Sequence, residues 1–248
     1  MIIKKTLIVG LIGISSVTLF APAAFAVTSE GDSKATVKFK AGTGVVNPVD
    51  PENPTKPIDP LDPSNPTDPG TGNTGSLTLD YVSSVNFGEH EVSSTEQSYS
   101  STSRKPFIQI SDRRGTGAGW KVTATATAFQ NEDGAASLSG ATLSFKNGET
   151  ASASNTATTP TAAQTVELPT DGTSIVSVVS AKESEGMGTW INRWFGATPN
   201  DTASLNNNVQ LTIPAGSATL GDHEATITWN FDCECCFGKR IGRHGNMD

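Results

Sequence analysis

The chain has 248 residues, and 25 acidic against 17 basic side chains give it a formal net charge of −8 at pH 7. Such an acidic chain lacks the basic surface that displaces counterions from nucleic acids, so we expect no nucleic-acid partner. All three cysteines lie within positions 233–236, which excludes a disulfide framework and leaves a hydrophobic core to stabilise the domain.

Residues 1–26 have the pattern of a signal peptide. Lys4 and Lys5 precede an apolar run from Leu7 to Phe20, and small alanines precede a cleavage site at Val27. The alternative, an uncleaved membrane anchor, conflicts with the length of the run, which is short for a bilayer. We therefore predict a secreted chain, whose net charge changes from −8 to −10 when the two lysines are removed.

Residues 27–46 hold one short expected element. From Ala35 to Ala41 apolar and polar side chains alternate, which places Val37 and Phe39 on one face of a strand. A single strand is not stable by itself in water. We expect it to pair with the chain's own domain, and the alternatives are pairing with a partner or disorder.

Residues 47–75 are expected to form a linker rich in Asp-Pro. Prolines recur at every third position from Pro48 to Pro69, which is the period of one polyproline II turn. At about 3.1 Å per residue this spacer would extend over about 90 Å. The alternative is a proline-rich ligand of a recognition domain, but such ligands usually carry basic anchors and this stretch has mostly acidic ones.

Residues 76–231 have the pattern of an all-β domain. The cleanest alternation covers residues 120–129, where Trp120 and small apolar side chains alternate with Lys and Thr. Clusters of Gly, Asn and Asp separate the apolar runs, and no segment shows a helical period with caps. We therefore predict a β-sandwich or a barrel-like fold. The expected strands are 76–82, 85–88, 105–112, 120–129, 141–145, 174–179, 209–213 and 224–231.

The sequence does not predict an enzyme. The histidines are His90, His223 and His244, and neither His-Glu pair has the second histidine of a zinc protease. No nucleophile elbow, phosphate-binding loop or calcium loop occurs, so we expect no catalytic residue, metal or cofactor. Residues 232–248 form an atypical tail whose close-packed cysteines do not match a tetrahedral metal site, and we interpret it as an unselected or frameshifted extension.

Two pairs of apolar residues are the first candidates for a ligand-binding face. They are Trp120 with Val122 and Trp229 with Phe231, and period-two spacing places each pair on one face of its strand. A tryptophan in a β domain often fills the core and donates its indole N–H to a carbonyl. An exposed indole can instead stack on a sugar ring, and the sequence leaves both roles open.

The segment 188–196 is a second candidate. Trp190 and Trp194 share parity on a strand, and Arg193 lies beside them. Tryptophan and arginine are the residue types enriched in binding hot spots. The alternative is a lid that packs over one end of the sandwich.

Several segments together resemble the WxL domain of Gram-positive surface proteins. They are the strand 35–39, the Asp-Pro spacer, the opening 77–81, the run 104–120 that ends at Trp120, and the late segments 211–216 and 225–229. Val122 and Phe231 stand where the family usually has leucine, and the cysteine-rich tail replaces the family's short polar end.

This resemblance implies a surface protein that is attached non-covalently to peptidoglycan and has a role in adhesion or in a surface complex. It also implies other WxL-system surface proteins and a membrane-anchored protein as partners, with host matrix proteins as further candidates. The alternative is an interaction protein that the membrane-anchored partner, rather than the wall itself, holds at the surface.

Overall fold

A computed structural model describes residues 30–58, 68–154 and 158–233. The expected signal peptide, the centre of the expected linker and all but two residues of the expected tail lie outside these described residues. Over the described ranges the chain has 15 strands and no helix, which confirms the predicted all-β class. In the same ranges, no helix is long and apolar enough to cross a membrane.

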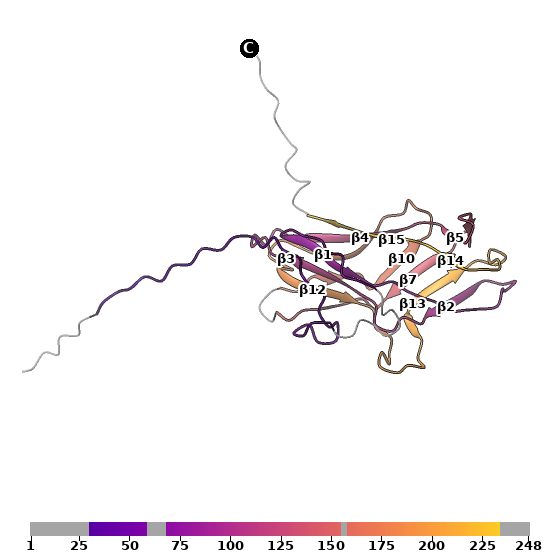
Figure 1. Cartoon of the computed structure of the whole chain (residues 1–248), viewed down its shortest axis with the longest axis horizontal. Helices are drawn as coiled ribbons and strands as arrows, with labels where there is room; N and C mark the ends of the chain where they lie inside the picture. The colour runs from indigo at the N-terminus through magenta and orange to yellow at the C-terminus, as the bar shows by residue number, and fades with distance from the viewer. Residues whose placement is uncertain (1–29, 59–67, 155–157, 234–248) are drawn as a thin grey trace, which may run out of the picture. The chain divides into compact units, whose positions relative to one another are not determined.

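The strands form four antiparallel sheets (Figure 1), ordered β1-β3-β12-β8, β15-β4-β11-β9, β10-β7-β13-β2 and β14-β5-β6. The strands of the first sheet are β1 (Leu77–Val82), β3 (Phe107–Asp112), β12 (Gly188–Arg193) and β8 (Glu149–Ala151). Those of the second are β15 (Ile227–Asp232), β4 (Trp120–Ala126), β11 (Val176–Ala181) and β9 (Thr161–Ala162). The third has β10 (Thr165–Pro169), β7 (Thr142–Lys146), β13 (Asn206–Ile213) and β2 (Gln97–Ser101). The fourth has β14 (His223–Glu224), β5 (Phe129–Asn131) and β6 (Ala136–Ser137).

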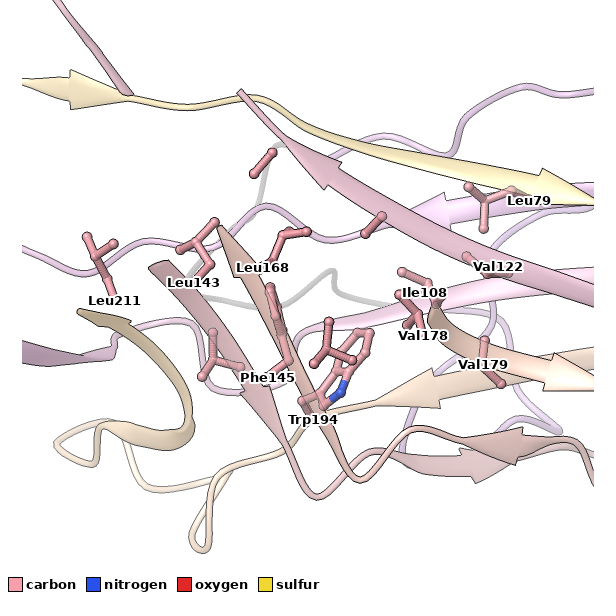
Figure 2. Packing of buried hydrophobic residues seen from close by; sticks show 14 of the residues in the cluster. Leu79, Ile108, Val122, Leu143, Phe145, Leu168, Val178, Val179, Trp194 and Leu211 are labelled. Atoms are coloured by element: carbon pink, nitrogen blue, oxygen red, sulfur yellow. The ribbon is translucent and has the colours of Figure 1, made fainter. Parts of the chain in front are cut away.

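One large hydrophobic core joins the first three sheets. Strand β4 alternates as predicted, because its even-numbered residues are buried and its odd-numbered residues are half-buried. In Figure 2 the apolar side chains of different sheets, such as Ile108, Val122 and Phe145, belong to the same cluster. Trp194 lies beside Phe145 in this view, with ring centroids 5.1 Å apart. The structure thus has the layered, sandwich-like packing that the sequence predicts.

Strand β3 is buried on both faces, because the core covers one face and part of the expected linker covers the other. Residues 48–58 fold back as a turn, closed by an antiparallel bridge between Val49 and Pro57, instead of extending away from the domain. Val49 and Ile58 pack on a second apolar cluster formed by Tyr81, Phe107 and Ile191. The predicted extended spacer is therefore wrong for residues 48–58, because two apolar residues between the prolines cover the outer face of the sheet.

Polar contacts hold this turn in place. The side-chain Nε2 of Gln109 donates to the carbonyl of Asn47 at 3.1 Å, and its Oε1 accepts from the backbone N–H of Val49 at 2.7 Å. Lys105 forms an ion pair with Glu52 at 2.6 Å. Further along, the backbone N–H of Thr71 donates to the carbonyl of Asp80 at 2.8 Å. The described ends of the expected linker therefore belong to the β domain.

Other expected elements also differ from the structure. Residues 35–41 form no strand, and the side chains of Val37 and Phe39 are 77% and 86% exposed. Residues 85–88 are not a strand either, and the expected strand 224–231 is divided between β14 and β15. Strand β2 was not predicted, because its sequence Gln-Ser-Tyr-Ser-Ser has only one apolar side chain to reveal the alternation.

Candidate functional site

The two tryptophan motifs lie side by side although more than a hundred residues separate them. Strands β4 and β15 lie side by side (Figure 1). They pair in an antiparallel ladder that places Phe231 opposite Val122 and Trp229 opposite Ala124. Residues directly opposite each other project to the same face of a sheet. Both motifs therefore face the core side of the second sheet.

Trp120 is a core residue. Its side chain is fully buried, and its indole Nε1 donates to the carbonyl of Gly186 at 3.0 Å. Gly186 has a φ of 69°, and a Cβ at this position would lie 2.7 Å from the indole nitrogen. Only glycine accepts both this backbone conformation and this close approach. The close approach of Gly186 to Trp120 depends on tertiary contact, so the sequence alone could not reveal it.

Trp229 and Phe231 are only half-buried, because β15 is the last strand on its side of the sheet. Buried rings support each of them from the core. Trp229 contacts Trp194 at a centroid distance of 5.9 Å and Phe145 at 6.1 Å. Phe231 meets Trp120 edge to face at 5.7 Å. Trp120 of the first motif thus supports Phe231 of the second, while Trp194 and Phe145 support Trp229.

A groove of about 260 Å³ opens between β15 and β1. Trp229 and Phe231 provide aromatic surface, and the segment before β1 provides hydroxyl and amide groups. Asn73 is held in place, since its Nδ2 donates to the carbonyl of Leu79 at 2.9 Å. None of the lining residues is charged. They are Asn73, Thr74, Leu77, Thr78, Leu79, Trp229 and Phe231.

Over residues 26–233 the chain matches the model of the WxL domain, described as a surface cell wall-binding domain. The chain belongs to the WxL domain family. It is therefore a surface protein with a cell wall-binding domain. No curated protein and no solved structure matches the chain.

In this WxL domain the segment 188–196 is not a surface cluster. Trp190 and Trp194 are 4% and 1% exposed, and they belong to the main core. The predicted shared parity is correct, but it directs both indoles inward, so neither ring is available for stacking on a ligand. The predicted alternative was a lid over one end of the sandwich, whereas the structure places both rings inside the core, with Trp190 on strand β12.

Arg193 connects the strand β12 to the folded-back linker. Its Nη2 lies 2.9 Å from Glu149 Oε1, and its Nη1 donates to the carbonyl of Pro51 at 2.6 Å. The guanidinium carbon also lies 5.0 Å from the ring centroid of Phe195. Because Glu149, Pro51 and Phe195 all contact its guanidinium, Arg193 stabilises the fold rather than offering a free group to a ligand.

A buried ion pair next to the motifs could not be recognised from the sequence. Asp112 is 2% exposed, and its carboxylate accepts two bonds from the guanidinium of Arg114, at 2.9 and 2.7 Å, and a third from its backbone N–H at 3.1 Å. This bonding raises the pKa of Arg114 above its ordinary value. Arg114 also donates to the carbonyl of Gly119 at 2.8 Å and to Sγ of Cys233 at 3.0 Å. Arg114 thus links the turn before Trp120 to Cys233, the residue that follows strand β15.

The histidines have local partners in the described chain. The ring of His90 stacks on Tyr99 with centroids 3.8 Å apart. The ring nitrogens of His223 lie 2.9 Å from Ser137 Oγ and 2.9 Å from the carbonyl of Thr219. His244 lies outside the described residues. Among those residues, no group of three or more His, Cys, Asp or Glu side chains is placed to hold a metal ion.

Proposed function

We propose that this WxL protein is secreted and held non-covalently on peptidoglycan through its β domain. The observation that carries the proposal is the match to a cell wall-binding domain over residues 26–233. That match begins at the last residue of the expected signal peptide, which supports a secreted mature chain starting at Val27. The half-exposed Trp229 and Phe231 offer a surface for such binding.

The protein then acts in adhesion or in a surface complex, with other WxL-system proteins and a membrane-anchored protein as its partners. Host matrix proteins are candidate ligands in the same role. We also propose that it binds rather than cleaves the wall, because the groove beside Trp229 offers hydroxyl, amide and aromatic groups and no carboxylate. A zymogram in which the purified protein cleared the wall substrate would contradict this part of the proposal.

Sedimentation with isolated peptidoglycan sacculi tests the attachment. The purified chain from Val27 onward should pellet with sacculi and stay in the supernatant without them. A protein that stays in solution with sacculi, but is lost from cells that lack the membrane-anchored partner, would instead support retention by that partner. The purified partner added to the sacculi provides the matched arm of the experiment.

A further inference from the structure

The groove between β1 and β15 has one accessible tryptophan. The chain contains four tryptophans, and Trp120, Trp190 and Trp194 are at most 4% exposed, whereas Trp229 is half-buried. A flat indole surface matches the apolar C–H face of a pyranose ring, whose rim carries hydroxyl and amide groups. Ligand sites commonly combine such apolar surface with a few polar groups that fix orientation.

The aromatic wall of the groove is already ordered before a ligand arrives. Trp194 and Phe145 support Trp229, and Trp120 supports Phe231, with centroid distances between 5.7 and 6.1 Å. Side chains that are fixed in advance lose little conformational entropy on binding. Such support for contact residues is expected of a binding site.

The absence of charged side chains from the groove favours uncharged wall polymers over anionic ones. Its lining residues include no lysine, arginine or histidine that could pair with a phosphate or carboxylate. The chain as a whole has a net charge of −8, which opposes the approach of an anionic polymer. The neutral sugars of the glycan strand fit this surface better than phosphate-rich polymers or acidic peptides do.

We propose that this groove binds the neutral, N-acetylated amino-sugar backbone of the wall, with one pyranose ring stacked on Trp229. This inference rests on the proposed attachment to peptidoglycan, and it names the chemical class that the domain recognises. Asn73 and Thr74 on the opposite wall lie where they can contact the polar rim of the sugar.

Soluble N-acetylglucosamine tetramer is the probe for the first experiment. Titration of the chain from Val27 onward should change its tryptophan emission in a saturable manner, and excess tetramer should release the protein from sacculi. The emission change should be absent in Trp229→Phe and retained in Trp190→Phe, a control that changes a buried ring. An equal emission change in Trp229→Phe would overturn the proposal.

The second experiment separates the sugar from the other wall polymers. Sacculi stripped of their phosphate-linked polymers by hydrofluoric acid should bind the chain as well as untreated sacculi do. Loss of binding after this treatment would identify an anionic polymer as the ligand and contradict the proposal.

Variants of the groove complete the test. Trp229→Ala should weaken sacculus binding tenfold or more, and Thr74→Met, which fills the groove from its exposed rim, should do so without removing an aromatic contact. Thr202→Met adds the same side chain at an exposed position outside the groove and should bind as the unchanged chain does. If the unchanged chain binds sacculi and folded Thr74→Met binds equally well, the groove is not the site. If the unchanged chain does not bind sacculi, the proposed attachment itself is wrong.

Discussion

The two tryptophan motifs have the same spacing and face the same side of one sheet, yet they have different environments. Strand β4 lies between β15 and β11, and its Trp120 and Val122 are fully buried. Strand β15 has one partner among the described strands, and its Trp229 and Phe231 remain half-exposed. The position of a strand in the sheet, rather than the motif, thus decides whether its aromatic side chain fills the core or meets solvent.

The largest expected effect separates the two motifs by stability. Trp120→Ala should lower the free energy of unfolding by about 3–5 kcal/mol, because it leaves a cavity in the core and removes the ring behind Phe231. Denaturant unfolding followed by circular dichroism measures this loss. Trp120→Phe retains a ring but not the N–H donor, so its loss should be smaller. A stability loss below about 1 kcal/mol for Trp120→Ala would contradict the core assignment.

The next effect concerns the glycine that contacts Trp120. Gly186→Ala should cost about 2–4 kcal/mol, because it combines a left-handed backbone conformation with overpacking. Its Cβ would lie 2.5 Å from Ala181 Cβ as well as against the indole. Gly216→Ala is the matched control, since Gly216 has a φ of 74° but nothing within 4 Å of the added Cβ. Equal unfolding energies for the two variants would show that the contact with Trp120 adds nothing.

A smaller effect is expected at the second motif. Trp229→Ala should lower the free energy of unfolding by about 1–3 kcal/mol, because the ring is only partly removed from water. The same denaturant measurement compares it directly with Trp120→Ala. If Trp229→Ala destabilised the domain as much as Trp120→Ala does, the difference between central and edge strands would not hold.

The smallest effect lies far from both motifs, in the folded-back linker. Lys105 donates a hydrogen bond to Glu52 and thereby lowers the pKa of this carboxyl from its ordinary value of 4.5. A lowered pKa in the folded state stabilises the protein above pH 4.5, and this contribution is lost as the pH falls through the folded-state pKa.

The pair is partly exposed, so Glu52→Gln should cost less than about 1 kcal/mol at pH 7. The difference from the unchanged chain should disappear in strongly acidic buffer, and unfolding curves at the two pH values measure it. Glu167→Gln, at an exposed strand position, is the matched control for the removal of one carboxylate. A difference that persisted in acid would mean that the charge of Glu52 is not its cause.

Strands could be predicted from the sequence where apolar and polar side chains alternate along the chain. Strands β1, β3, β4 and β7 lie close to their expected positions because their alternation is strong. The folded-back linker could not be predicted, because the proline period conceals Val49 and Ile58, and their burial depends on a sheet face formed by distant residues. The role of the segment 188–196 was undecided for a similar reason. Parity shows that Trp190 and Trp194 point the same way, but not whether that way is toward solvent.

The sequence by itself determined the all-β class and the shared face of each tryptophan pair, because these depend on local period and composition. The family followed from the resemblance of several motifs, which the match to the WxL model confirmed. Only the tertiary structure decided that β4 is a central strand and β15 an edge strand, since strand order arises from contacts between segments far apart in the chain. Burial follows from that order. Trp120 therefore became part of the core, and Trp229 became a wall of the groove.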